Sequence, residues 1–304
     1  MTKFWEAMAG KFADRWAALA GSAFVFWAGA VLVVVYARRR NGGLGAQMDV
    51  VLRQPVATQV TVCVAALVVA SGSALFVRRV APLVLTIVQG PWRGWGLSKL
   101  SSVFADKAAA KVKRWDAEWL AIAGKLPNAT PEEREHYTRL DARLLRYPTA
   151  DFLPTPVGNA VRASDCRIEE KYGLGVAVVW PRLWLLLPQQ VRDELSVGRA
   201  AVDAVCCTTV WGAAFALFGF WAWWAVPAGA AVVAASVCWW LPPRVSNFSD
   251  LTESAIDLHR LSLYEQLRLS LPTSTAEERD DGAALTEYLY RGTSPDRELK
   301  PKAT

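Results

Sequence analysis

Residues 204–243 read AVCCTTVWGAAFALFGFWAWWAVPAGAAVVAASVCWWLPP, and no charged side chain lies between Asp203 and Arg244. This stretch predicts two membrane spans, at about 204–225 and about 226–241. Tryptophans mark both ends of the hairpin, as expected at membrane–water interfaces. The second span is short, about 24 Å of helix. It therefore fits either a tilted crossing of a thin bilayer region or a re-entrant element.

Two further apolar runs precede this hairpin, at about 17–36 and about 56–77. The first is uncharged and lacks a signal-peptide cleavage pattern, so we interpret it as a retained span. In the second, Ala66, Ala70 and Ala74 fall four residues apart, a spacing of small residues that lets helices approach closely in lipid. The apolar piece that follows, 80–92, is too short to span, and we expect it to lie at the interface.

The remaining sequence is polar and helical in pattern, and it completes a predicted division into five parts. These are an N-terminal transmembrane hairpin with an interfacial segment (1–92), a helical, cytoplasmic domain (93–203), the second transmembrane hairpin (204–243), C-terminal cytoplasmic helices (244–292) and a disordered tail (293–304). The predicted fold class is an all-α integral membrane protein, in which two transmembrane hairpins with four spans flank a helical extramembrane domain.

Capping residues and prolines predict the ends of the extramembrane helices. Thr130 and Glu133 form a capping box for a helix that should reach about Tyr147. Thr155 caps the next helix, and Gly173 is suited to its left-handed C-terminal residue.

Two helices are expected after the second hairpin. The first covers about 249–271, and the second begins at a capping box over 275–278.

A basic stretch with tryptophans lies early in the helical domain. Its members are Lys107, Lys111, Lys113, Arg114, Trp115 and Trp119. This composition suits a helix on an anionic membrane surface. It equally suits a solvated helix that packs its tryptophans inward, and both interpretations stay open.

The basic residues near the spans predict the topology. Nine lie on the side of the termini and the helical domain, and four lie on the other side, which favours cytoplasmic termini. The nine are Lys3, Lys11, Arg15, Arg78, Arg79, Arg93, Arg192, Arg199 and Arg244, and the four are Arg38, Arg39, Arg40 and Arg53. The predicted location is the cell (cytoplasmic) membrane.

The sequence contains no motif for catalysis or metal binding that we recognise. Four of the five cysteines lie in apolar runs, and none has a zinc-site spacing. His259 and Asp257 share a helix with Ser262, but neighbours on one helix rarely form a nucleophile and its base. Asp203, at the mouth of a span, is a further weak polar candidate, and Arg199 four residues earlier offers it a local partner. No cofactor is predicted, and the net charge of +6 fits a membrane protein better than a nucleic-acid-binding one.

The segment 147–188 is the densest in prolines, glycines and aromatic residues. It contains Pro154-Thr155-Pro156-Val157-Gly158-Asn159, then Tyr172-Gly173, then Trp180-Pro181-Arg182-Leu183. These elements resemble a group of uncharacterised multi-pass membrane proteins of bacteria, often actinobacteria. The resemblance covers about a tenth of the chain and implies a shared architecture without a known activity.

Four residues of this segment are candidates for lipid or partner contact. Asn159 and Arg182 have no evident structural role in the sequence, and Arg182 is flanked by Trp180 and Trp184, where a guanidinium can stack or bind a phosphate. Pro181 and Pro188 should bracket a short apolar element between them. That element must be buried in the domain or pressed onto the bilayer.

Three functions are compatible with these observations. The first is a membrane-anchored assembly or regulatory module that binds a protein partner or further copies of itself. The second is an oligomeric pore or transporter. The third, a membrane-associated enzyme, is disfavoured by the missing catalytic motifs.

Overall fold

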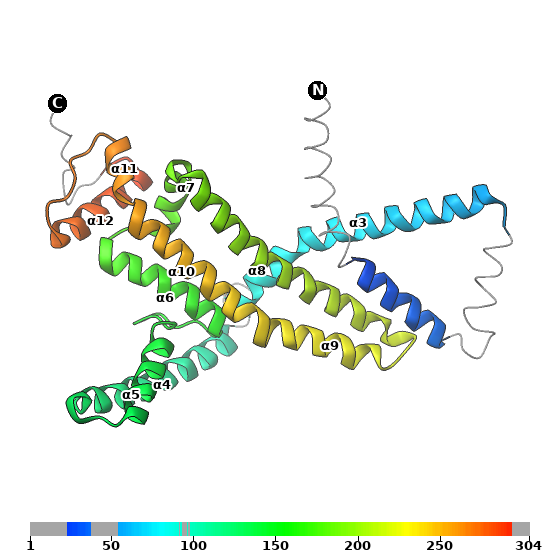
Figure 1. The fold of residues 1–304 in the computed structure, drawn as a ribbon, viewed down its shortest axis with the longest axis horizontal. Coiled ribbons are helices and arrows are strands. Elements are labelled where there is room, and N and C mark those ends of the chain that lie inside the picture. The colour runs from blue at the N-terminus through cyan, green and yellow to red at the C-terminus, as the bar shows by residue number, and fades with distance from the viewer. Residues whose placement is uncertain (1–22, 38–53, 91, 93–95, 97, 294–304) are drawn as a thin grey trace. The chain divides into compact units, whose positions relative to one another are not determined.

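The computed structural model describes residues 23–37, 54–90, 92, 96 and 98–293 (Figure 1). The described residues form α-helices joined by short 3-10 helices, one π-helical turn and loops, and they contain no β-strand. The all-helical fold class is confirmed. The chain forms two compact units, one within residues 1–85 and 203–241 and the other within residues 86–202 and 242–304.

Three helices of the described chain are long and apolar enough to cross a membrane. They are Val56–Gln89, Gln189–Phe220 and Ala225–His259. The described part of the first predicted span is the helix Ala23–Ala37, which is shorter, and residues 17–22 lie outside the described residues. The connector after it, with Arg38, Arg39, Arg40 and Arg53, also lies outside them.

The first unit packs the helix Ala23–Ala37 against α3 (Val56–Gln89) and α8 (Gln189–Ala216). Trp27 donates its indole N–H to the hydroxyl of Ser73 at 3.1 Å. Phe26 lies 4.5 Å from Trp211, measured between ring centroids. Beyond α8, the 3-10 helix Leu217–Phe220 leads to α9 (Ala225–Ala235), so the hairpin turns before residue 225, where we predicted the end of the third span.

The second and fourth predicted spans continue further than expected. The helix α3 passes through Arg78 and Arg79 without a break, so the predicted interfacial piece 80–92 is largely its C-terminal part. Charged side chains mark an interface but do not stop a helical backbone.

The fourth predicted span does not end at Leu241. It passes through a π-helical turn, Ser236–Trp240, into α10 (Leu241–His259). Pro242 and Pro243 lack the N–H groups that an α-helix would direct to Cys238 and Trp239, and a wider turn there keeps the helix continuous.

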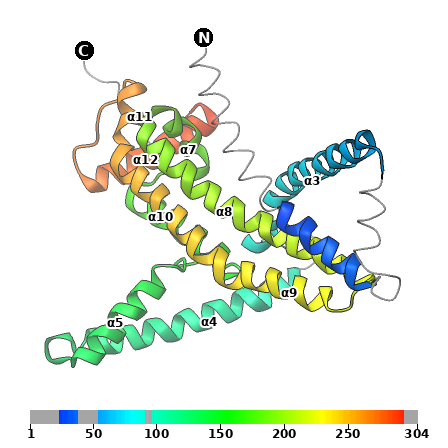
Figure 2. The same cartoon turned by 45° about the vertical axis from the view of Figure 1, so that its right-hand side comes forward.

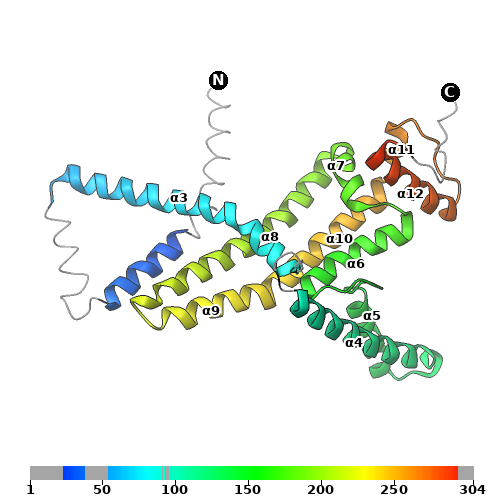
Figure 3. The same ribbon diagram turned by 180° about the vertical axis from the view of Figure 1, so that it is seen from behind.

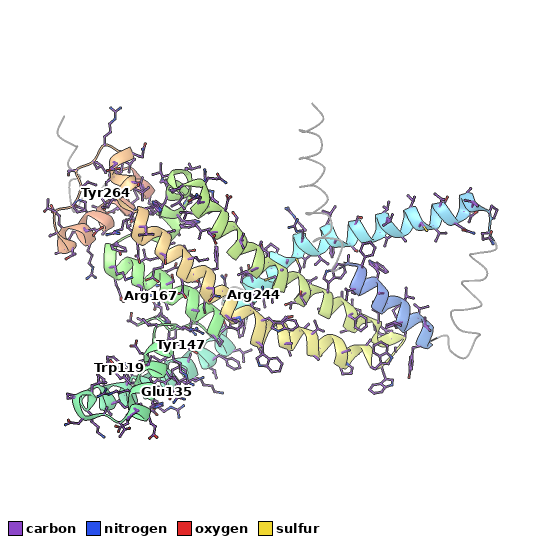
Figure 4. The ribbon with its side chains drawn as sticks, in the orientation of Figure 1. Trp119, Glu135, Tyr147, Arg167, Arg244 and Tyr264 are labelled. Atoms are coloured by element: carbon purple, nitrogen blue, oxygen red, sulfur yellow. The ribbon has the colours of Figure 1, made fainter. Side chains whose placement is uncertain are left out.

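The second unit has its hydrophobic core between α6 (Pro156–Tyr172), α7 (Val176–Leu186), α10, α11 (Leu261–Gln266) and α12 (Thr275–Arg291). Figure 3 shows α7, α11 and α12 gathered at one end of α6 and α10. The fully buried side chains include Ile168, Val179, Leu183, Ile256 and Leu285. Tyr264, labelled in Figure 4, is 1% exposed in the same core.

Helices α4 (Ser98–Ala123) and α5 (Pro131–Leu144) form a paired arm of the second unit (Figure 2). The predicted capping box is present, with Thr130 and Glu133 each accepting a backbone N–H of the other. Trp119 stacks on Tyr137 with ring centroids 5.2 Å apart.

Several predicted helix ends need correction. The helix expected to reach Tyr147 ends at Leu144, and the one expected over 249–271 is divided into α10 and α11. The last helix is capped by Ser274, one residue before the predicted cap, since its hydroxyl accepts the N–H of Glu277. Pro181 does not begin the apolar element, because α7 already starts at Val176. The predicted Thr155 and Gly173 caps of α6 are confirmed.

Candidate functional site

The helix α6 carries the candidate site, and its N-terminus meets the C-terminal end of α3. Thr155 accepts the N–H of Gly158 at 3.0 Å and donates its hydroxyl to the carbonyl of Val88 at 2.5 Å. The next carbonyl, that of Gln89, lies directly against the Cα of Gly158. The partial negative charge at the end of α3 thus faces the partial positive charge at the start of α6, which is a favourable pairing.

Asn159 holds the loop that precedes α6. Its side-chain amide accepts the N–H of Leu153 at 2.8 Å and donates to the carbonyls of Leu153 and Thr155. The residue is 1% exposed. Asn159 therefore has the structural role that the sequence did not reveal, and in this conformation its amide is withdrawn from lipid or a partner.

Arg182 links α7 to α12. Its guanidinium donates to the carbonyl of Val178 on its own helix at 2.6 Å and to the carbonyl of Leu289 at 3.1 Å. The rings of Trp180 and Trp184 have their centroids 5.9 Å apart, and both pack against the core of the second unit. Most of the apolar element that we expected to need covering is thus covered within its own unit, whereas Leu185 is 74% exposed.

A network of charges joins α6 to α10. Arg167 donates two hydrogen bonds to one carboxylate oxygen of Glu253, at 2.9 and 2.6 Å, and a further bond to the carbonyl of Leu145. Lys171 donates to the other oxygen of Glu253 at 2.8 Å. Figure 4 labels Arg167 on α6, which lies beside α10. The Glu253 side chain is only 11% exposed, so this pairing offsets the cost of burying its charge.

The same network continues to α12. Tyr172 donates its hydroxyl to Asp257 at 2.8 Å, and burial together with this hydrogen bond raises the pKa of Tyr172 to about 12. Arg260 lies over the Tyr172 ring at 4.1 Å from its centroid and pairs with Glu278 at 2.5 Å. The last turn of α6 is thereby fixed to both α10 and α12.

Of the weak polar candidates, the structure brings only Asp257 into this network. His259 is half-buried at the last residue of α10, and Asp203 is half-buried on α8 in the other unit. Glu253, Arg167 and Lys171 were missed as site residues. A signal existed in the spacing of four residues. It places the basic Arg167 and Lys171 on one face of α6, and the acidic Glu253 and Asp257 on one face of α10.

The charged groups of this arrangement bind one another and thereby join helices of the second unit. The carboxylates of Glu253, Asp257 and Glu278 each face a cation or a hydroxyl donor. The described residues contain no group of three His, Cys, Asp or Glu side chains placed to hold a metal ion. Burial, the largest influence, raises the pKa of the Cys166 thiol on α6, which disfavours the reactive thiolate.

The small residues of α3 occupy two different environments. Ala70 and Ala74 are each 6% exposed, and Ala74 packs with Ala23, Val77 and Trp211. Ala66 is exposed. The face that we predicted for helix packing is therefore partly filled within this chain, and only its N-terminal portion stays available to another helix.

No family model, curated protein or solved structure that we compared matches this chain. Its class accordingly rests on its own features. Its described residues are helical, with three helices long and apolar enough to cross a membrane, and partly buried ion pairs join helices of the second unit.

Proposed function

We propose that this chain is a multi-pass protein of the cell membrane, which anchors a helical interaction module. In this proposal the module binds a protein partner or further copies of the chain, and its role is assembly or regulation. Lipid surrounds the exposed apolar side chains of the candidate spans, such as Leu75 and Phe76, which are 63% and 67% exposed.

The joint between α3 and α6 is the observation that carries the proposal. A candidate span ends with its carbonyls held by Thr155 and pressed against Gly158. The helix α6 is in turn fixed to α10 by the Arg167–Glu253 ion pair and packs closely against Gly282 of α12. This arrangement ties the end of the span to a well-packed helical unit through backbone contacts. It suits a chain in which a candidate span leads directly into a packed helical module.

The proposed topology has four spans in two hairpins, with the termini and residues 93–203 in the cytoplasm. The excess of basic residues on that side supports it. Reporters active only in the cytoplasm, fused after Thr304 and inserted at Asn128, test it. Both should be active. Activity of periplasmic reporters at the same two sites would instead show that the topology is inverted.

Mild solubilisation of native membranes, followed by mass determination, tests the function. We expect a complex of fixed stoichiometry, with a second protein or with further copies of this chain. Gly158→Ala should lower the yield of the complex while the chain stays in the membrane, and Gly72→Ala, on an open face of α3, should not. A single-chain species in the wild type contradicts the proposal, and solute flux through reconstituted wild-type protein would favour a pore or transporter.

A further inference from the structure

The first turns of α4 expose apolar side chains to solvent. Leu100, Val103 and Phe104 are 46%, 48% and 41% exposed. Their spacing of three and four residues places them on one face of the helix. The helix α5 pairs with the later part of α4, where Tyr137 stacks on Trp119 and Arg143 lies over the ring of Trp115. Leu100, Val103 and Phe104 lie earlier in α4 than these contacts.

Basic side chains lie on and beside the same face. Lys99, Lys107 and Lys111 are exposed, and Lys107 lies 5.6 Å from the ring centroid of Phe104. Between residues 98 and 114 the only acidic side chain is Asp106. We call the set Lys99, Leu100, Val103, Phe104, Lys107 and Lys111 the α4 patch.

The α4 patch is held at the end of a candidate membrane span. The indole N–H of Trp92 donates to the carbonyl of Ile87, in the last turn of α3, at 2.7 Å. The ring of Trp92 meets Phe104 edge to face, with centroids 6.3 Å apart. Large exposed apolar side chains continue along α3 as far as Leu83 and Ile87, so the surface that the proposed function assigns to lipid extends to this level. A tryptophan there is typical of the membrane–water interface.

We infer that the α4 patch docks on the surface of an anionic lipid leaflet. The apolar residues enter the interface, and the lysines face acidic headgroups, each of which favours the bound state. This is an interaction surface in addition to the spans, and it adds the charge class of the lipid to the proposed function. For the N-terminal part of the basic stretch, the inference favours the membrane-surface interpretation. Trp115 and Trp119, further along the stretch, pack inward on α5.

Hydrogen exchange of the full-length protein in nanodiscs tests the inference. One preparation contains phosphatidylcholine alone, and the other contains equal parts of phosphatidylcholine and phosphatidylglycerol. Peptides within 98–108 should exchange at least about tenfold more slowly in the anionic nanodiscs, because two or three lysines contribute. High salt should remove most of the difference, since these charges are exposed.

The charge-reversal variant Lys107→Glu/Lys111→Glu should abolish the difference between the two lipids. The matched control Lys113→Glu/Lys125→Glu changes the net charge equally and should keep it. Lys113 lies about 200° round the helix from Lys111, and Lys125 follows the helix end. Unchanged exchange in α6 verifies that each variant is folded. Equal exchange in the two lipids, or an equal loss in the control, overturns the inference.

Discussion

The Cα of Gly158 lies directly against the carbonyl oxygen of Gln89, and a Cβ added at residue 158 would overlap that oxygen. The contact joins the first turn of α6 to the last residue of α3. Because both contact atoms belong to the backbone, neither can move aside by changing a rotamer. Glycine is therefore required at position 158 because there is no room for a Cβ, and not because of an unusual backbone conformation.

Gly158→Ala should destabilise the protein by about 1–3 kcal/mol, because the two helices must separate. The midpoint of thermal unfolding in detergent, followed by tryptophan fluorescence, measures this. Gly72→Ala is the control, since a Cβ there meets no atom within 4 Å and alanine is the better helix former. If both variants unfold at the wild-type temperature, the joint is not a tight contact.

Glu253→Gln should cost about 2–3 kcal/mol, because it leaves Arg167 half-buried without its carboxylate. Glu135→Gln, which removes an exposed pair with Arg139, should change stability by less than about 0.5 kcal/mol. Figure 4 labels both Arg167 and Glu135. Chemical denaturation of the two variants compares them, and equal effects would mean that the Arg167–Glu253 pair contributes only as a surface pair does.

Leu183→Ala should cost about 2–5 kcal/mol, since Leu183 is 0% exposed in the core of the second unit. Leu185→Ala, two residues further along α7 and 74% exposed, should be nearly neutral. Limited proteolysis in membranes detects the difference as cleavage within 98–202. Equal protection in both variants would show that α7 does not pack as described.

Tyr172→Phe tests the hydrogen bond to Asp257 through its pH dependence. Burial and this hydrogen bond raise the folded-state pKa of Tyr172 from 10.0 to about 12. The stabilisation that depends on the neutral hydroxyl is therefore complete below pH 10 and is lost as pH rises from 10 towards 12. At neutral pH the free energy of unfolding of the wild type should exceed that of the variant by about 1 kcal/mol. Thermal midpoints above pH 10 should converge, and a constant difference across that range would contradict the assignment.

Local signals predicted the helix ends that depend on neighbouring residues. Thr155 with Pro156 starts α6, and Gly173 ends it, because these features act within one turn of the backbone. The apolar runs likewise predicted helices that could cross a membrane. Their limits were less accurate, since helical hydrogen bonding continues through Arg78–Arg79 and, with a π-helical turn, through Pro242–Pro243.

The candidate site could not be predicted in the same way, because its contacts join distant parts of the chain. Glu253 meets Arg167 across 86 residues, and Arg182 meets the backbone of Leu289 across 107. The structural role of Asn159 was missed for a different reason. Its three hydrogen bonds are local, but they satisfy a loop conformation that no helix or strand pattern encodes.

The seam between α6 and α12 has a consequence for how the sequence can vary. A Cβ at Gly282 would overlap the carbonyl of Tyr172, and one at Gly173, whose φ is +66°, would overlap the carbonyl of Arg279. At each glycine the nearest atoms belong to the backbone of the facing segment. A change of side chain elsewhere therefore cannot make room for a substitution at either position. In a saturation library selected for folded protein, both positions should return glycine alone, while Gly292, with a similar φ of +80° but open space around it, should also admit asparagine. The two glycines therefore fix the distance between α6 and α12, and substitutions elsewhere in the core cannot change it.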